Sequence, residues 1–134
     1  MSFKLNSILE QDSIFMTKLE LCQLRLMNNS DFPWVILVPE LSNIVEIMDL
    51  KTSEFDKLNS EILKVAKIIK SVFNPDKLNI ATLGNIVPQM HIHIVARFKN
   101  DKLFPKPVWG HVFNRYSLEK SNDIIDSIKT VMVQ

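Results

Sequence analysis

Polar and apolar residues alternate along residues 89–98, which is the period of a β-strand with one buried face. Gln89, His91, His93 and Arg97 fall on one face of this predicted strand. The opposite face carries only apolar side chains, namely Met90, Ile92, Ile94, Ala96 and Phe98. Two of the three histidines of the chain therefore lie side by side on one strand face, a rigid setting for two titratable groups.

The earlier part of the chain predicts three more strands. Residues 13–18 form the first, and residues 20–27 form the second, whose alternation groups Cys22 with Leu24 and Leu26 as buried side chains. Residues 32–39 are almost continuously apolar, with prolines only near the two ends. A strand that is apolar on both faces is expected at the centre of a sheet that is covered on both sides.

Helices are predicted before, between and after these strands. Asn6 or Ser7 caps a short helix through Glu10, and another short helix covers residues 42–50. Ser53 is the predicted N-cap of a long helix that ends at Asn74-Pro75-Asp76. Its buried stripe at helical spacing consists of Phe55, Leu58, Ile62, Val65, Ile69 and Val72.

The remainder of the chain adds a strand at 77–83 and a terminal helix at 118–133, while residues 103–111 are irregular around two prolines. The predicted fold class is α+β, an antiparallel sheet of about five strands with one long helix and one or two shorter ones largely on one side. At 134 residues the whole chain, 1–134, is expected to form a single domain.

Composition narrows the possible partners. The net charge is +1, from 16 basic and 15 acidic residues, and gives no electrostatic support for binding a nucleic-acid polymer or a membrane surface. Cys22 is the only cysteine, so an internal disulfide is impossible and a reducing environment fits best. Residues 1–6 lack the apolar stretch of a signal peptide, and a cytoplasmic location is expected.

The His91–His93 pair allows three interpretations. Two histidines on an exposed sheet face can be without function, which is the usual case for an isolated His-x-His. They can supply two ligands to a metal ion, with His111 or a carboxylate as the third. They can also act in nucleophilic catalysis, one imidazole attacking phosphorus while its neighbour handles charge or a proton.

Residues 84–95, GNIVPQMHIHIV, resemble the signature of the histidine-triad (HIT) family, in which three histidines alternate with hydrophobic residues and two more hydrophobic residues follow. The order of elements over residues 13–98 is also similar to that family. The resemblance implies a nucleotide-binding hydrolase or transferase that acts on the α-phosphate of nucleotide conjugates. It also implies a homodimer whose two sheets join into one, and no metal or other cofactor in the covalent step.

Individual roles follow from the same resemblance. His91 matches the nucleophile, which forms a covalent nucleotidyl-imidazole and is oriented by a backbone carbonyl of its own strand, and His93 matches a phosphate contact. Gly84 and Asn85 match a Gly-Gln pair that helps to bind phosphate. Asn28 matches the ribose-binding residue, with Asn29 as the neighbouring candidate and ordinary turn chemistry as the alternative for both.

Two positions depart from the family pattern. Gln89 replaces the first histidine of the triad, and Trp34 replaces a histidine that many members carry on the hydrophobic strand. An amide donates hydrogen bonds but does not transfer a proton as imidazole does, so protonation of the leaving group falls to His93 or is not needed. His111 has no assigned role, and Trp109 is interpreted as a structural aromatic rather than a base-stacking residue.

The function predicted from the sequence is therefore hydrolysis or transfer on a purine nucleotide conjugate, such as a dinucleoside polyphosphate or a nucleoside phosphoramidate. His91 and His93 are the predicted catalytic residues, and Asn28, Gly84, Asn85 and Gln89 are the predicted substrate-binding residues. A nucleotide-binding module with little turnover and a metal-dependent histidine site are the two alternatives.

Overall fold

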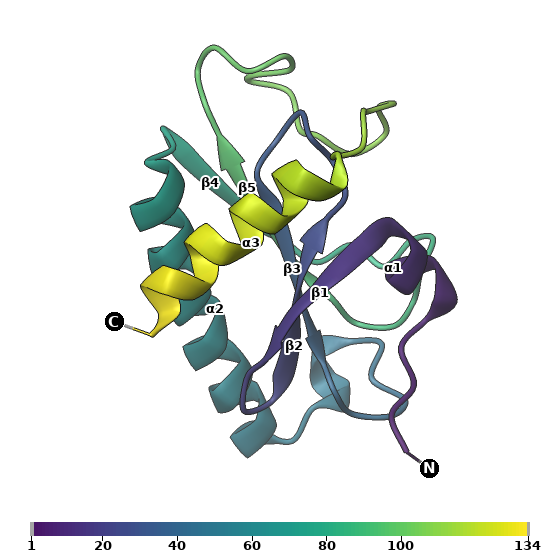
Figure 1. Cartoon of the computed structure of the whole chain (residues 1–134). Helices are drawn as coiled ribbons and strands as arrows, with labels where there is room; N and C mark the ends of the chain where they lie inside the picture. Colours follow the sequence, from purple (N-terminus) through teal and green to yellow (C-terminus); the bar gives the residue numbers. More distant parts are fainter. Residues whose placement is uncertain (1, 134) are drawn as a thin grey trace.

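A computed structural model describes residues 2–133, and over these residues five strands form one antiparallel sheet in the order β1-β2-β3-β5-β4 (Figure 1). The elements in chain order are α1 Ser7–Asp12, β1 Ser13–Lys18, β2 Cys22–Met27, β3 Trp34–Pro39, the 3₁₀ turn η1 Ile47–Asp49, α2 Thr52–Phe73, β4 Lys77–Ala81, β5 Ile92–Arg97 and α3 Leu118–Met132. The α+β fold with a five-stranded antiparallel sheet is therefore confirmed.

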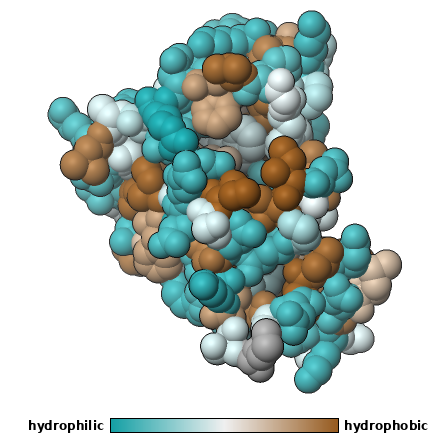
Figure 2. Space-filling view, turned by 90° about the vertical axis from the view of Figure 1, so that its right-hand side faces the viewer, coloured by the Kyte–Doolittle hydropathy of each residue, from teal (hydrophilic) through white to brown (hydrophobic). Residues whose placement is uncertain are grey.

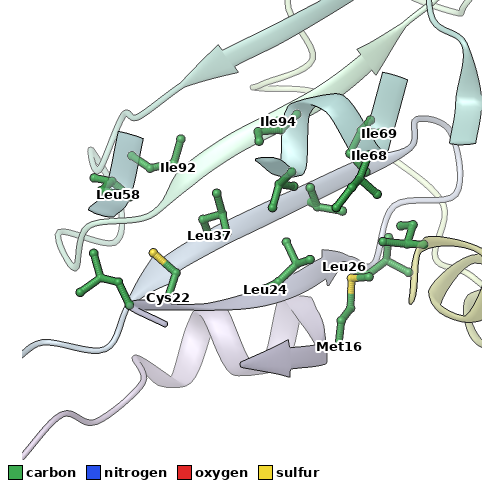
Figure 3. Packing of buried hydrophobic residues seen from close by; sticks show 14 of the residues in the cluster. Met16, Cys22, Leu24, Leu26, Leu37, Leu58, Ile68, Ile69, Ile92 and Ile94 are labelled. Carbon is green, nitrogen blue, oxygen red and sulfur yellow. The ribbon is translucent and has the colours of Figure 1, made fainter. Parts of the chain in front are cut away.

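The two long helices cover one face of the sheet. Their apolar stripes meet the sheet in a buried group that we call the helix-side core (Figure 3). Its members include Leu24, Leu37, Ile92 and Ile94 from the strands and Leu58, Val65, Ile69, Ile125 and Ile128 from α2 and α3. Cys22 also belongs to it, as its alternation with Leu24 and Leu26 predicted, and burial raises the pKa of its thiol far above the ordinary value.

A smaller buried group lies on the other face of the sheet, and we call it the second core. It joins β3 and β5 to α1 and to three loops, which precede β3, precede β5 and follow β5, through Leu9, Phe32, Trp34, Ile36, Val38, Val87, Val95 and Val108. Every residue of β3 is buried, as expected for an apolar strand covered on both faces. Two of the segments that build the second core, α1 and the loop before β5, also lie beside His91, which precedes β5, and His93, which lies within it.

The long helix follows its predicted stripe, but its start differs from the prediction. Helix α2 begins at Thr52, and Lys51 rather than Ser53 is the N-cap. The carboxylate of Glu54 accepts a hydrogen bond from the backbone N–H of Lys51 at 2.7 Å, which closes the first turn two residues earlier than predicted. At the other end Asn74 adopts the left-handed conformation, with φ of 49°, and ends the helix where the Asn-Pro sequence indicated.

The prediction of a helix over residues 42–50 was wrong, because only η1, Ile47–Asp49, is helical there. Asn43 has a φ of 62°, which interrupts any right-handed helix at its start. The carboxylate of Asp49 instead accepts the backbone N–H groups of Val45 and Glu46 at 3.0 and 2.8 Å. A side chain thus replaces the carbonyl partners that a helix would have supplied.

The ends of the other elements shift by a few residues. Strand β2 begins at Cys22, β4 ends at Ala81 and β5 begins at Ile92, so the predicted strand over 89–98 is shorter at both ends. No helix within residues 2–133 has the length and hydropathy required to cross a bilayer. A single domain over 1–134 stays a prediction, and its two terminal residues lie outside the described range.

Candidate active site

The two histidines of the predicted site lie on the sheet face opposite the long helices. His91 immediately precedes β5, and His93 lies within it, opposite Ile36 of β3 and Ala81 of β4. Since Ile92 and Ile94 point into the helix-side core, alternation turns both imidazoles to the other side. The rings are 4.8 Å apart between centroids and only 7% and 6% exposed.

His91 is held in one tautomer by its own chain. Its Nδ1 lies 2.8 Å from the backbone carbonyl oxygen of Gln89, so this nitrogen carries the hydrogen and donates it. Burial lowers the pKa of His91, and the bond to the Gln89 carbonyl opposes that shift only in part. The ring is therefore a neutral imidazole whose Nε2 lone pair is free, since Nε2 has no hydrogen-bond partner among the described residues.

His93 has the opposite tautomer. The indole Nε1–H of Trp34 donates a hydrogen bond to His93 Nδ1 at 3.0 Å, so Nδ1 is an acceptor and the hydrogen resides on Nε2. Burial, and to a smaller extent the neighbouring charge of His91, lower the pKa of His93 to about 3. One ring thus presents a lone pair at Nε2 and its neighbour presents an N–H at the same position.

A cavity of about 340 Å³ opens beside the two rings. Its wall combines the histidines with the loop before β5, with α1 and with the segment 109–110, through Ile8, Leu9, Asp12, Met27, Leu83, Gly84, Asn85, Ile86, Val87, His91, His93, Trp109 and Gly110. Figure 2 views the side of the molecule that carries α1 and shows hydrophobic patches among polar residues there. A mainly apolar cavity with a few convergent polar groups is typical of a small-molecule site.

The comparison with known proteins identifies the family. The HIT domain model matches residues 9–100 of the chain. This protein belongs to the HIT domain family. A histidine triad protein of Marinobacter aquaeolei VT8 is 34% identical, with a TM-score of 0.95 over 98% of this chain and 96% of that one. A histidine triad (HIT) protein of Sinorhizobium meliloti 1021 is 38% identical, with a TM-score of 0.94 over 96% of both chains.

A curated relative covers a smaller region. The bis(5'-nucleosyl)-tetraphosphatase [asymmetrical] of Schizosaccharomyces pombe is 32% identical over 72 residues, which are 50% of this chain. The match spans only 39% of the length of that relative. This HIT-family chain is thus similar to a named hydrolase over about half of its own length, and to two solved HIT proteins over nearly their whole length.

Two predicted substrate-binding residues of this HIT domain lie in the cavity wall. Gly84 has a φ of 72°, a left-handed conformation that favours glycine. Asn85 follows it in the same loop and also lines the cavity. These two residues are therefore brought together with His91 and His93, although they precede them by several residues in the chain.

The other two predicted binding residues have partners elsewhere. The Gln89 side chain accepts a hydrogen bond from Asn6 N and donates one to Lys4 O, both at 2.8 Å, and does not line the cavity. The Asn28 side-chain oxygen accepts the backbone N–H of Tyr116 at 2.8 Å, and Asn28 is likewise absent from the wall. Both contacts join residues more than 80 positions apart, which no local pattern could indicate.

Three further residues named in the sequence analysis lie near the site or on the same face of the sheet. Trp109, interpreted as structural, lies in the cavity wall with its ring 5.3 Å from that of His93. His111 lines a separate cavity of about 150 Å³. Arg97 lies on the histidine face, as its alternation predicted, where it is 1% exposed and bound to Asp101.

Helix α1 is the part of the site that sequence analysis missed. Ile8, Leu9 and Asp12 bring it to the cavity, yet a six-residue helix carries no motif that would mark it as functional. The signal that could have found it is the apolar pair Ile8-Leu9 within an otherwise polar segment over residues 6–12. In the part of the chain that the structure describes, no three His, Cys, Asp or Glu side chains meet in an arrangement that could hold a metal ion.

Proposed function

We propose that this HIT-family protein hydrolyses or transfers the nucleotidyl group of purine nucleotide conjugates, with His91 as the nucleophile. The observation that carries the proposal is the 2.8 Å contact between His91 Nδ1 and the Gln89 carbonyl, in a ring that lines a cavity. This contact leaves Nε2 with a lone pair at neutral pH, which is the requirement for attack on phosphorus.

The proposed reaction has two steps. His91 Nε2 attacks the α-phosphorus, the bond from phosphorus to the leaving group breaks, and a covalent nucleotidyl-His91 forms. Water then attacks the same phosphorus, and the electron pair of the P–N bond returns to Nε2. His93, as an Nε2–H donor 4.8 Å away between ring centroids, would bind a phosphate oxygen and stabilise the developing charge.

The remaining cavity residues suit the rest of a nucleotide conjugate. Gly84 and Asn85 are proposed to contact the phosphates, because they lie in the same wall as both histidines. Ile8, Leu9 and Ile86 offer an apolar surface for a purine. The proposed ribose contact of Asn28 rests on the family resemblance, and it would use the side-chain NH₂ group because the oxygen is bound to Tyr116.

The activity named for the fission-yeast relative supports dinucleoside polyphosphates as one substrate class to test. A homodimer in the cytoplasm is part of the same proposal. Strand β4 is an edge of the sheet with an unbroken register to β5, whereas β1 at the other edge carries a bulge between Phe15 and Thr17. Bulged edges resist pairing, so β4 is the edge better suited to join a second copy.

The test is to trap the covalent intermediate. The protein is incubated with diadenosine tetraphosphate labelled at the α-phosphates and quenched, and an acid-labile labelled protein is sought. We expect the label on wild type and its complete loss in His91→Ala. His111→Ala is the matched control, because this histidine is exposed and lines a different cavity. Tight binding with neither adduct nor product would instead identify a nucleotide-binding module.

A further inference from the structure

Trp34 occupies a position where it controls the protonation of His93. The indole is 4% exposed and belongs to β3, which is hydrogen-bonded to β5 along Trp34–Leu37. Its ring also contacts Trp109 edge-on at 5.7 Å and Phe113 at 6.5 Å between centroids. A side chain enclosed in this way has one orientation, so the 3.0 Å hydrogen bond from Nε1 to His93 Nδ1 is a fixed feature of the site.

This hydrogen bond is incompatible with a charged His93. An imidazolium carries hydrogen on both nitrogens, and its Nδ1–H would face the indole N–H, which has no lone pair to accept it. Two donors would then oppose each other in a buried place, which is costly. Burial and the neighbouring His91 disfavour the charged ring as well. His93 can thus donate its Nε2–H to a substrate oxygen, but it does not hold a spare proton to release.

The other titratable groups of the cavity do not replace that missing acid. His91 commits its only N–H to the Gln89 carbonyl and uses Nε2 for the attack. Asp12, the one other Asp, Glu or His side chain of the wall, already pairs with the guanidinium of Arg115 at 3.4 Å. Gln89, at the position of the first triad histidine, points to the N-terminal segment and is an amide.

We propose that Trp34 is a positioning residue that keeps His93 a neutral Nε2–H donor, and that the site therefore selects conjugates whose leaving group departs as a phosphate or polyphosphate anion. This inference rests on the proposed function and names its substrate class. Dinucleoside polyphosphates belong to that class, whereas phosphoramidates of alkylamines do not, because an amine must take up a proton to leave.

Dinucleoside polyphosphates and alkylamine phosphoramidates differ in whether the leaving group must take up a proton. With a dinucleoside polyphosphate, the bridging oxygen keeps the electron pair of the broken P–O bond and departs as an anion, so no proton is transferred. His91 becomes an N-phosphorylated ring that keeps its Nδ1–H, and the later attack of water releases one proton to solvent. With an alkylamine, the nitrogen would depart as an amide anion unless an acid protonated it during the bond cleavage.

A series of adenylyl conjugates tests this selectivity without any mutation. The series keeps adenosine 5'-monophosphate as the transferred group and varies the leaving group from polyphosphate through phenols of graded acidity to an alkylamine. We expect log kcat/KM to fall steeply with leaving-group pKa, and the alkylamine to be slower by about 10²–10⁴-fold, the usual contribution of a general acid. Equal turnover of the alkylamine and the polyphosphate would overturn the proposal and leave the proposed function intact.

Two variants of Trp34 test its part directly. Trp34→Phe keeps an aromatic ring but removes the N–H, and Trp34→His supplies a ring nitrogen that can accept a hydrogen bond from the Nδ1–H of a protonated His93. We expect Trp34→His to flatten the leaving-group dependence and raise the alkylamine rate relative to polyphosphate, while Trp34→Phe leaves the wild-type slope without that gain. An unchanged slope in a folded Trp34→His would contradict the role assigned to Trp34.

Nitrogen-15 NMR of the histidine rings reads the tautomer independently of turnover. We expect His93 in wild type to show a protonated Nε2 and an unprotonated Nδ1 at neutral and mildly acidic pH, and Trp34→Phe to lose this single tautomer. A hydrogen on Nδ1 of wild-type His93 would overturn the proposal. If the tautomer is as expected but no conjugate forms an adduct or product, the proposed function fails together with its substrate class.

Discussion

At the scale of the residue, Gln89 supports the site through hydrogen bonds of both its backbone carbonyl and its side chain. Its backbone carbonyl orients His91, a contact that any residue at this position could make. Its side chain binds Asn6 N and Lys4 O and so fixes the segment that leads into α1. Because α1 supplies Ile8 and Leu9 to the cavity, Gln89 affects the shape of the site without facing the histidines.

Replacing Gln89 by alanine is therefore expected to weaken substrate binding without slowing the attack of His91 on phosphorus. The two lost hydrogen bonds contribute about 0.5–1.5 kcal/mol each, so the segment 2–12 becomes less ordered while His91 keeps its carbonyl partner. We expect KM for diadenosine tetraphosphate to rise by up to about tenfold, with kcat nearly unchanged. A tenfold rise corresponds to a loss of about 1.4 kcal/mol of binding free energy. Steady-state kinetics and hydrogen exchange of residues 2–12 measure both effects.

Gln11→Ala is the control for this variant, since Gln11 lies exposed on the same helix. If Gln89→Ala instead lowered kcat by about two orders of magnitude at constant KM, the amide of Gln89 would have to contact the reacting atoms, contrary to its observed direction. The same observation predicts that Gln89→His does not add a general acid, because the side chain at this position points to Lys4 and Asn6 rather than into the cavity.

The sequence could identify most of these residues but not their contacts. His91, His93, Gly84 and Asn85 are close together in the chain, so their meeting at one cavity followed from a strand and the loop before it. The position of Trp34 was recognised as unusual, but its bond to His93 depends on the register between β3 and β5. Contacts made across a sheet are determined by tertiary structure, which periodicity does not encode.

At the scale of the element, the end of β5 is fixed by a buried ion pair. Arg97 binds both carboxylate oxygens of Asp101 at 2.8 and 3.1 Å and Asn79 Oδ1 at 3.0 Å. Its guanidinium also lies over the rings of Phe32 and Phe104. Asp101 in turn accepts backbone N–H groups of residues 98, 103 and 104, so one carboxylate organises the whole turn after β5.

Asp101→Asn is expected to destabilise the protein by about 3 kcal/mol at pH 7, because it leaves the buried Arg97 without its counter-charge. Burial alone would raise the pKa of Asp101, but hydrogen bonds from Arg97 and three backbone N–H groups hold it well below its ordinary value. Stability from a carboxylate with a lowered pKa is present above about pH 4 and is lost as the pH falls through the folded-state value.

The difference between wild type and Asp101→Asn should therefore shrink as the pH falls below about 4, which urea unfolding at a series of pH values measures. Glu20→Gln is the control, since Glu20 pairs with Lys57 at the surface, and its effect should stay below about 1 kcal/mol. A loss of equal size at pH 3 and pH 7 would show that the charge of Asp101 is not what stabilises this turn.

Most elements could be predicted because their hydrophobic period was clear. The strand at 13–18 and the terminal helix followed from local patterns, and α2 from one long apolar stripe. The segment 42–50 looked helical by composition, yet Asn43 and the Asp49 side chain gave its backbone a different set of partners. Competition between side chain and backbone for the same N–H groups is the physical reason for that error.

At the scale of the whole molecule, the two edges of the sheet differ in how well their strands suit pairing with another chain. Figure 1 shows α2 and α3 side by side, with α1 away from both. At one edge β1 has a bulge and ends at Lys18, whose ammonium pairs with Glu40. At the other edge β4 is regular and exposes Ile80, 46% accessible, which suits it for pairing with another chain.

If two copies join through β4, a charge at Ile80 should separate them. Sedimentation of wild type is expected to give twice the 15.5 kDa mass of the chain, and Ile80→Lys is expected to give the monomer, because like charges would face each other across the two-fold axis. Met48→Lys is the matched control, since Met48 is 77% exposed and far from β4 in sequence.

Activity measured alongside the mass shows whether the site depends on the second copy. Since β4 pairs with β5 next to His93, loss of a partner strand would loosen the support of the histidines, and we expect the Ile80→Lys monomer to be less active than Met48→Lys. A wild type that sediments as a monomer at micromolar concentration would contradict dimerisation through this edge. A monomeric Ile80→Lys with full activity would show instead that each chain holds a complete site.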